Sequence, residues 1–152
     1  MTPQDFIAAI APAAQISMVA SKIPASFTIA QGALESTWGG SELALQARNL
    51  FSVKADQSWH GPFVLMNSAE YVMGKSVMLP ARWRQYPDWQ SCIDDRVQFF
   101  RLNPRYAACF AETTGAGWAR AVQSAGYATD PAYADKLVEV INFHNLTQYD
   151  TP

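Results

Sequence analysis

One segment with the pattern of β-strands interrupts a chain whose other patterns are helical. It reads FVLMNSAEYVMGKSVMLPARWRQY over residues 63–86, and Gly74-Lys75 fits a two-residue hairpin turn with glycine first. Pro80 cannot donate a hydrogen bond to a neighbouring strand, which places the return strand at an edge. A sheet of two or three strands is unstable alone, so it must pack on helices. We therefore expect an α+β fold, mainly α, with a small antiparallel β-hairpin lobe at about residues 60–86.

Helical patterns occupy the rest of the chain. Apolar residues recur at spacings of three and four, as in Phe27, Ala30 and Leu34, which gives a helix a buried face. In the first part of the chain, the expected helices cover residues 2–22, with a break or restart at Pro12, residues 24–40, with a stop at Gly39-Gly40, and residues 41–48, with Ser41 as cap. After the β segment, we expect a helix from residue 88, a short helix after residues 103–104, a helix over residues 117–125 and a last helix after the cap at residues 129–131. Residues 147–152 are expected to form a loose tail. No repeat or linker divides the chain, so residues 1–152 are expected to form one domain.

The composition is that of a globular protein and argues against several other classes. Hydrophobic residues make up 49% and charged residues 16% of the 152 residues, which argues against disorder. No apolar run approaches the roughly 18 residues of a membrane span, and the formal net charge of -2 argues against a nucleic-acid surface. We expect a monomer that neither inserts into membranes nor binds nucleic acid. Cys92 and Cys109 lie in apolar helical patterns and are expected to be free and buried.

Glu35 stands out because it is placed where a carboxylate is disfavoured. It lies in the stretch ALESTWGG, near the end of a predicted helix and beside the apolar Leu34 and Trp38. The negative end of the helix dipole and the apolar neighbours both oppose ionisation, so the pKa of this carboxyl should be raised. Such a glutamate is either satisfied by a basic partner, for which Arg48 and Arg82 are candidates, or used as an acid.

Five motifs occur in an order that matches one enzyme family. They are ALESTWGGSELA, NLFSVKA, AEYVMGKSVMLPARWRQY, NPRYAACF and AGYATDPAYADKL. Together they resemble the peptidoglycan endo-β-N-acetylglucosaminidases of glycoside hydrolase family 73, including the hydrolase domain of flagellar rod proteins. The resemblance covers about residues 6–141. It implies a lysozyme-like fold in which a substrate cleft runs between a helical lobe and the β-hairpin lobe.

The resemblance implies catalytic roles for three residues. Glu35 matches the family's general acid, which must be protonated near neutral pH to donate to the departing glycosidic oxygen. Glu70 matches a second acidic position on the β lobe, proposed as base or as helper of the attacking water. Tyr127 matches a cleft tyrosine thought to assist catalysis. The sequence leaves open an inverting route, a covalent intermediate and assistance by the substrate's own N-acetyl group.

Further residues are expected to contact the glycan. Asn49 and Phe51 match residues that line the floor of the family's cleft. The other candidates are aromatic rings that can stack on sugars and guanidinium groups that can meet the carboxylates of the wall: Trp38, Trp59, Tyr71, Trp83, Arg82 and Arg84. Arg82 and Arg84 share one strand face, and a solvated pair is the alternative for them.

The chain departs from the family's pattern at two positions. Family members often have glycine where Thr37 and Ser52 stand here, and neither departure touches the acid. His60 and His144 lack Cys or acidic companions at ligand spacing, so neither a metal nor another cofactor is expected. Asp94-Asp95 is expected to face solvent on its helix.

The expected activity is hydrolysis of the β-1,4 bond between N-acetylglucosamine and N-acetylmuramic acid in peptidoglycan, cut on the glucosamine side. A muramidase or lytic transglycosylase of the same fold is the alternative among enzymes, and a catalytically silent glycan-binding module is the alternative outside them. The substrate lies in the periplasm or cell wall. The start MTPQDFIAAIAP lacks the basic region of a secretory signal, so release by phage lysis, as an endolysin, or delivery by a secretion or tail apparatus is expected.

Overall fold

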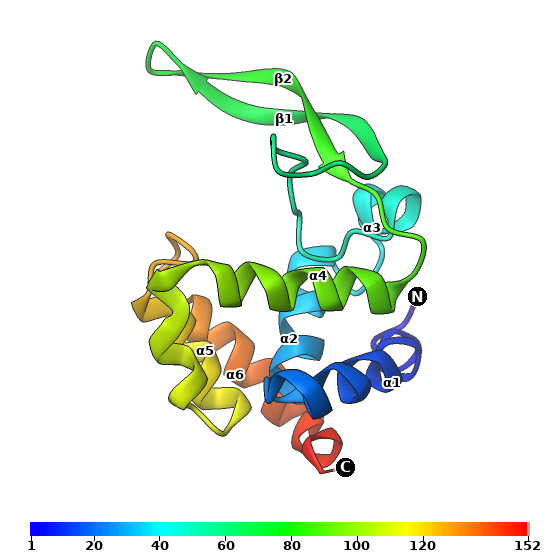
Figure 1. Ribbon diagram of the computed structural model, residues 1–152, viewed down its shortest axis with the longest axis vertical. Helices are drawn as coiled ribbons and strands as arrows, with labels where there is room; N and C mark the ends of the chain where they lie inside the picture. Colours follow the sequence, from blue (N-terminus) through cyan, green and yellow to red (C-terminus); the bar gives the residue numbers. More distant parts are fainter. Residues whose placement is uncertain (152) are drawn as a thin grey trace.

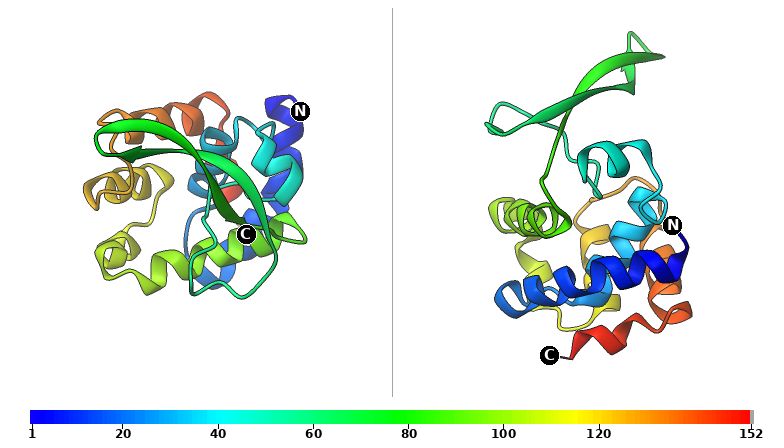
Figure 2. Two further views of the ribbon diagram at one scale, coloured as in Figure 1. Left: turned by 90° about the horizontal axis from the view of Figure 1, so that it is seen from above. Right: turned by 90° about the vertical axis from the view of Figure 1, so that its right-hand side faces the viewer.

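The computed structural model describes residues 1–151 as a helical body with a β-hairpin projecting from it (Figure 1). The α-helices are α1 (Pro3–Ser21), α2 (Ala25–Ser36), α3 (Glu42–Ala47), α4 (Trp89–Leu102), α5 (Gly115–Ser124) and α6 (Tyr133–Phe143); η1 (Pro104–Ala111) and η2 (Leu146–Asp150) are 3-10 helices; the strands are β1 (Phe63–Val72) and β2 (Lys75–Arg84). Seen from above, the two strands cross over the helical body (Figure 2). The expected fold class, α+β and mainly α, is confirmed. None of the described helices is long and apolar enough to cross a membrane.

Helix α2 is the centre of the body and carries Glu35 in its last turn. All of its residues except Leu34 and Glu35 are buried, and it packs against α1, α5, α6 and η2. A helix buried on nearly every side fits only in a core. It ends before the predicted stop at Gly39-Gly40, because Thr37 and Trp38 already adopt left-handed backbone with φ of 52° and 55°.

Aromatic rings fill the core around α2. Phe27 of α2, Phe100 of α4 and Trp118 of α5 contact one another, with ring centroids 5.5 to 6.2 Å apart. The two cysteines, Cys92 and Cys109, are free and buried, as the sequence predicts. This core holds α2 rigidly and so fixes the position of its carboxyl end.

Helix α1 is continuous, and the predicted break at Pro12 is wrong. The helix begins at the Thr2 cap, which accepts a hydrogen bond from the backbone N–H of Asp5 and donates its own N–H to the Asp5 carboxylate. Pro12 removes the hydrogen bond to the carbonyl of Ala8, but both residues lie on the exposed side, where water can satisfy that carbonyl. The buried stripe on the opposite side packs on the core, and the helix continues through the proline.

The tail, predicted to be loose, is ordered as far as the structure describes it. Residues Leu146–Asp150 form η2, and Leu146 is fully buried. The Asp150 carboxylate accepts hydrogen bonds from the backbone N–H and hydroxyl of Ser26, at 2.8 and 2.6 Å. Pro24, the residue before α2, offers no side-chain cap. The Asp150 carboxylate from the tail instead accepts a hydrogen bond from a backbone N–H in the first turn of α2.

The hairpin has a different turn from the one predicted. Val72 pairs with Lys75, so the two turn residues are Met73 and Gly74, not Gly74-Lys75. Both have positive φ, 52° and 79°, which is the pattern of a type I′ turn. The register runs from Phe63 opposite Arg84 to this turn. An isolated bridge between Lys54 and Trp83 adds one further pairing beside β2.

Candidate active site

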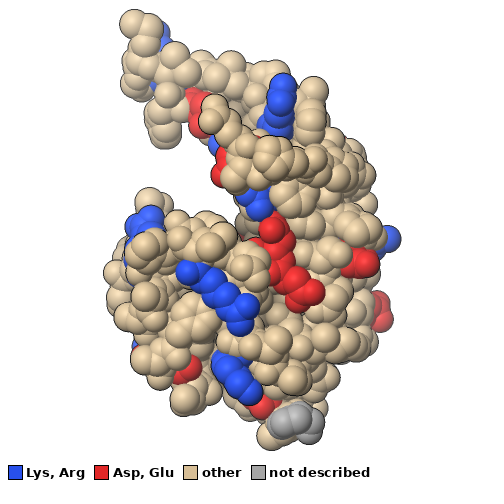
Figure 3. All heavy atoms as spheres, in the orientation of Figure 1, with Lys and Arg blue, Asp and Glu red and all other residues tan. Residues whose placement is uncertain are grey.

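A cavity of about 430 Å³ lies where the hairpin lobe meets the helical body. The space-filling view shows a hollow between the two lobes that opens to one side (Figure 3). Each neighbouring element contributes to the cavity wall: α2 (Glu35), the loop of residues 51–56 (Phe51, Ser52, Val53, Lys54, Asp56), β2 (Arg84), α4 (Asp95, Arg96, Phe99), η1 (Tyr106) and the segment after α5 (Tyr127). The structure thus brings two of the three predicted catalytic residues, Glu35 and Tyr127, into one cavity.

The carboxyl of Glu35 has neutral and positive groups around it. The hydroxyl of Tyr127 donates to Oε2 at 3.2 Å, and the hydroxyl of Tyr133 lies 3.4 Å from Oε1. Burial raises the pKa of Glu35 from 4.5 to about 7, while the positive charge of Arg96 and the two tyrosine hydrogen bonds oppose that rise. Neither Arg48 nor Arg82 pairs with Glu35. A carboxyl with a pKa near 7 can be protonated at neutral pH and still give up its proton.

The two tyrosines form a stacked pair beside Glu35. Their rings stack with centroids 5.7 Å apart, and the Tyr127 ring also contacts Phe99, Phe100 and Tyr106. Burial raises the pKa of both hydroxyls, so both stay protonated and can donate. The sequence motif identified Tyr127, but not Tyr133, as a site residue.

Glu70 lies outside the cavity wall, on the hairpin. Its carboxylate pairs with the ammonium of Lys54 at 2.7 Å, and that Lys54 side chain lines the cavity. The hydrogen bond from Lys54 and one from Ser68 hold the pKa of Glu70 below its usual value, so it is ionised at neutral pH. Lys54 also lies over the ring of Trp83, 5.6 Å from its centroid. Glu70 therefore stands at the rim of the site, connected to it through Lys54.

The loop of residues 51–56 forms the cavity floor. The motif predicts both Asn49 and Phe51 in this floor, and the structure places Phe51 there but not Asn49. Phe51 is buried and lines the cavity. Asn49 is buried beneath the loop. Its amide group donates to the carbonyls of Val53 and Arg84, both at 2.9 Å, and its carbonyl accepts from the Val53 N–H. Asn49 thus ties the loop to β2 and positions the floor from below, without lining it.

Among the described residues, the predicted substrate contacts that line the cavity are Phe51 and Arg84, whereas Trp38, Trp59, Tyr71, Arg82 and Trp83 do not. Trp38 packs edge-on against Phe6 and His144, on another side of α2 from the cavity. Tyr71 is 83% exposed next to the hairpin turn. Arg82 is exposed and lies over the Phe63 ring, 4.9 Å from its centroid.

The strand register explains why these hairpin residues separate. Opposed residues share a face, so Glu70 with Val77 and Trp83 with Val64 lie on one face of the hairpin. Tyr71 and Arg82 have the opposite parity and lie on the other face. The face that Lys54 covers, next to the cavity, is therefore that of Glu70 and Trp83.

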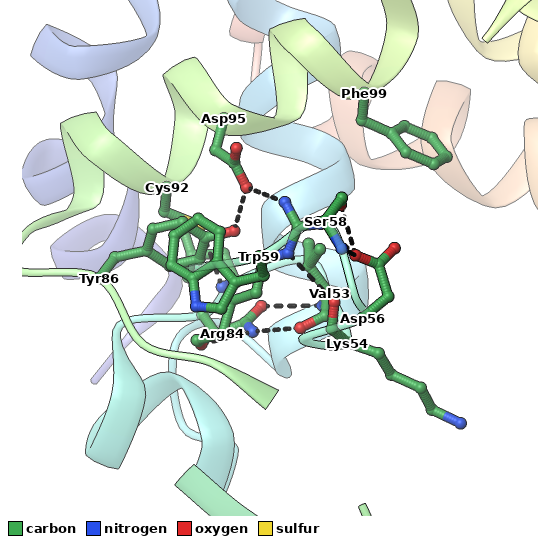
Figure 4. A network of polar contacts seen from close by, with 12 residues as sticks. Val53, Lys54, Asp56, Ser58, Trp59, Arg84, Tyr86, Cys92, Asp95 and Phe99 are labelled. Carbon is green, nitrogen blue, oxygen red and sulfur yellow. Dashed lines mark hydrogen bonds and ion pairs between the residues drawn. The ribbon is translucent and has the colours of Figure 1, made fainter. Parts of the chain in front are cut away.

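A polar network joins β2 to α4 along the cavity (Figure 4). The guanidinium of Arg84 pairs with Asp95 at 2.8 Å and with Asp56 at 3.5 Å, and it lies over the ring of Trp59. Tyr86 donates to the same Asp95 oxygen at 2.6 Å. The prediction that Asp95 faces solvent is therefore wrong, and Arg84 is occupied by partners within the protein. This network fixes the base of the hairpin to the helical body.

The family assignment follows from comparison with known proteins. The sequence profile of the glucosaminidase family, described as mannosyl-glycoprotein endo-beta-N-acetylglucosaminidase, matches residues 11–146. The chain belongs to this family. The expected resemblance to glycoside hydrolase family 73 is thereby confirmed.

Individual glucosaminidase relatives agree with this placement. The chain is 37% identical over 142 residues to the peptidoglycan hydrolase FlgJ of Salmonella typhimurium, covering 91% of this chain and 45% of that protein. It is 37% identical over 152 residues to the exo-glucosaminidase LytG of Bacillus subtilis, covering 97% of this chain and 53% of that protein. The chain thus spans about half the length of these curated relatives. The catalytic domain of the autolysin Auto from Listeria monocytogenes superposes with a TM-score of 0.88 at 32% identity, covering 97% of this chain and 87% of that domain.

The two departures from the glucosaminidase pattern coincide with special backbone geometry. Thr37 and Ser52 have φ of 52° and 54°, in the left-handed region that favours glycine. Glycine at these positions in other members would adopt this backbone without strain. Both residues flank the site, Thr37 at the end of α2 and Ser52 in the cavity floor.

Several residues of the site were not identified from the sequence as site residues, among them Arg96, Tyr133 and Asp95. Arg96 had a recognisable signal, because it lies between Ile93 and Phe100 on the apolar stripe of α4, where a charge needs a partner. Tyr133 had a weaker one, a hydroxyl on the buried face of the last helix. Among residues 1–151, no group of three His, Cys, Asp or Glu side chains could hold a metal ion.

Proposed function

We propose that this protein hydrolyses the β-1,4 bond between N-acetylglucosamine and N-acetylmuramic acid in peptidoglycan, on the glucosamine side, with Glu35 as general acid. The observation that carries the proposal is the Glu35 carboxyl, which faces a cavity between two lobes with a pKa of about 7. Family membership supports the same reaction class. An acid that is half protonated near neutral pH suits cleavage of a glycosidic bond, whose leaving oxygen must gain a proton.

In the proposed reaction, Glu35 donates its proton to the glycosidic oxygen as the bond from that oxygen to the anomeric carbon breaks. Glu35 is then a carboxylate, and the hydroxyls of Tyr127 and Tyr133 are placed to donate hydrogen bonds to it. The tyrosines thereby favour the form of Glu35 that exists after proton transfer. They hold the carboxyl in one orientation toward the cavity.

We propose two routes for the attack on the anomeric carbon: either Glu70 activates a water molecule, or the substrate's own N-acetyl group attacks first and water then opens the cyclic intermediate. Glu70 is ionised, as a base must be, but its carboxylate is paired with Lys54 at the rim. It would have to leave Lys54, or move with it, to reach a sugar next to Glu35. Substrate assistance needs no second carboxylate near the anomeric carbon.

The proposed substrate contacts follow the cavity wall. Phe51 forms part of the floor. The Trp83 ring does not line the cavity, but it lies beneath Lys54, which does, and we propose that it contacts sugars that extend beyond the cavity. The ammonium of Lys54 is a further candidate, since muramic acid and its peptides carry carboxylates. We propose that the protein acts as a monomer in the periplasm or cell wall. Release by phage lysis or delivery by a secretion or tail apparatus stays a prediction.

The product of digestion tests this proposal. Purified peptidoglycan is digested with the protein, and the released muropeptides are analysed by mass spectrometry before and after borohydride reduction. The proposal predicts reducing ends on N-acetylglucosamine. Reducing N-acetylmuramic acid would show a muramidase, and 1,6-anhydro ends would show a lytic transglycosylase. If no soluble fragment is released and the protein still sediments with the wall, it is a glycan-binding module.

A further inference from the structure

Arg96 is a fully buried cation that the proposed reaction does not use directly. It is 2% exposed and lies on the apolar stripe of α4. Its guanidinium lies 5.3, 4.5 and 5.1 Å from the ring centroids of Phe27, Phe51 and Phe100. Burial lowers the pKa of Arg96 to about 10, which still leaves it positively charged at neutral pH. A buried charge of this kind is costly, so its place beside Glu35 calls for a physical reason.

The hydrogen bonds of Arg96 have only one possible direction. Arginine has five N–H donors and no acceptor. Nη1 therefore donates to Oε1 of Gln31, and Nη2 donates to the hydroxyl of Thr28 at 2.6 Å. This fixes the orientation of the Gln31 amide, whose oxygen must face Arg96 and whose nitrogen must face away.

The fixed amide determines the direction of the next two hydrogen bonds. Nε2 of Gln31 donates to the hydroxyl oxygen of Tyr133 at 3.0 Å. The Tyr133 hydroxyl has one proton, and with its oxygen accepting from Gln31 that proton is free for Oε1 of Glu35, 3.4 Å away. A donor-only residue thus starts a chain from Arg96 through Gln31 and Tyr133 that ends at the acid.

We propose that Arg96 is a positioning residue for the acid: it orients the chain through Gln31 and Tyr133 so that the chain donates to Glu35, and its charge favours the carboxylate that Glu35 becomes. The proposal rests on the proposed role of Glu35. Burial alone would make Glu35 a weaker acid than proton donation near neutral pH requires. The positive charge of Arg96 lowers the pKa of Glu35 and so offsets part of the rise that burial causes.

Other charged and titratable groups also surround the cavity. Tyr127 and Tyr133 contact Glu35 directly. Around the rest of the wall are Lys54 and Asp56 from the loop, Arg84 from β2, Asp95 from α4 and Tyr106 from η1, with Glu70 of β1 at the rim. Four of these groups form two ion pairs, since Arg84 binds Asp95 and Lys54 binds Glu70. Arg96 differs from them because its hydrogen bonds lead toward Glu35.

The test is a direct titration of Glu35 in the intact protein. Glutamate is labelled with ¹³C at the side-chain carboxyl, the Glu35 signal is assigned by its loss in Glu35→Gln, and its shift is followed from pH 4 to pH 10. The variants are Arg96→Met, Arg96→Lys and Tyr133→Phe. Arg101→Met is the matched control, because Arg101 is an exposed arginine of the same helix that bonds the Ala20 carbonyl. This readout does not require that the protein cleave peptidoglycan.

We expect Arg96→Met to raise the pKa of Glu35 by about 1 or more, because an opposite charge nearby lowers a carboxyl pKa by about that amount. Arg96→Lys keeps the charge and should raise the pKa of Glu35 less. Tyr133→Phe removes the hydroxyl that donates to Glu35 and should also raise the pKa of Glu35. Arg101→Met should leave it near 7. In wall-lysis assays, the pH above which the rate falls should shift in each variant by as much as the pKa of Glu35 shifts in that variant. A pH profile that does not follow the titrated pKa would count against the acid role of Glu35, whereas the effect of Arg96 on the Glu35 carboxyl is judged by the titration alone.

An unchanged Glu35 titration in folded Arg96→Met would overturn the proposal, as would a shift of equal size in Arg101→Met. If Arg96→Met does not fold, Tyr133→Phe and Arg96→Lys decide: an unchanged pKa of Glu35 in both overturns it. If Arg96 only stabilised the fold, its replacement would lower the free energy of unfolding and leave the pKa of Glu35 unchanged. Loss of activity in Glu35→Gln tests the proposed function separately.

Discussion

Replacing Glu35 by glutamine should remove a loss of stability that wild type suffers as the pH rises. The folded protein holds the proton of Glu35 up to about pH 7, whereas an unfolded chain releases it near the ordinary value of 4.5. Between these values the folded state binds one more proton than the unfolded state, so the free energy of unfolding falls as pH rises. The stabilisation is fully present below about pH 4.5 and is lost as the pH passes through about 7.

The size of this effect follows from the two pKa values. Each pH unit between them corresponds to about 1.4 kcal/mol, so the total change approaches about 3 kcal/mol. Glutamine cannot ionise and has no such loss. The free energy of unfolding of Glu35→Gln, minus that of wild type, should therefore grow by about 3 kcal/mol from pH 4.5 to 7.5 and then level off.

Urea denaturation followed by circular dichroism measures this difference at each pH. Glu70→Gln is the control, because Glu70 is exposed and its pKa is held low by Lys54, so its difference from wild type should be flat from pH 5.5 to 8. A flat difference for Glu35→Gln as well would refute the argument that burial raises the pKa of Glu35. A difference of opposite slope would mean that Glu35 is stabilised as a carboxylate.

Three further predictions concern other parts of the site and its support. Glu70→Gln should lower the wall-lysis rate about 10- to 1000-fold, less than Glu35→Gln, and an unchanged rate would favour substrate assistance. Thr37→Gly should raise the free energy of unfolding by about 1 kcal/mol in urea denaturation, because it relieves left-handed backbone at a β-branched residue; destabilisation would show that the Thr37 side chain compensates the strain. Asp150→Ala should cost about 1 kcal/mol by removing the acceptor for Ser26, and no loss would show that the tail does not support α2.

Local patterns in the sequence predicted most of the helices, and the resemblance of five motifs to a known family predicted the reaction class. Helix α2 was found from its apolar spacing, and Ser41 and Asp88 act as the helix caps their residue types suggest. Glu35 stood out because the end of a helix and apolar neighbours both oppose ionisation of its carboxyl, which raises the pKa as a general acid requires. These features depend on neighbours within a few positions in the chain.

The failed predictions depended on contacts between distant segments. Pro12 does not end α1, because burial of the opposite face outweighs one lost hydrogen bond on the exposed side. The tail is ordered by Ser26, 124 positions away from Asp150. The hairpin turn was placed one residue late, and a shift of this kind cannot be corrected without the partner strand.

The same limit applies to the site residues. Asn49 was expected in the cavity floor but holds the floor from below, through bonds to a strand 35 positions away. Arg96 of α4 and Tyr133 of α6 are connected through Gln31 of α2, which forms a hydrogen bond with each of them. Spacing along the chain does not reveal such a chain of hydrogen bonds.

The central claim is that Glu35 supplies the proton for glycosidic cleavage, and the lysis rate of Glu35→Gln on purified peptidoglycan tests it most directly. The rate is measured by turbidity near pH 6, beside wild type and the Arg101→Met control, with circular dichroism spectra to confirm that all three are folded. Glutamine keeps the shape of the side chain but has no proton to give, so the rate should fall to well under a tenth of wild type while Arg101→Met keeps full activity. A folded Glu35→Gln protein that retains more than a tenth of the wild-type rate would contradict the claim.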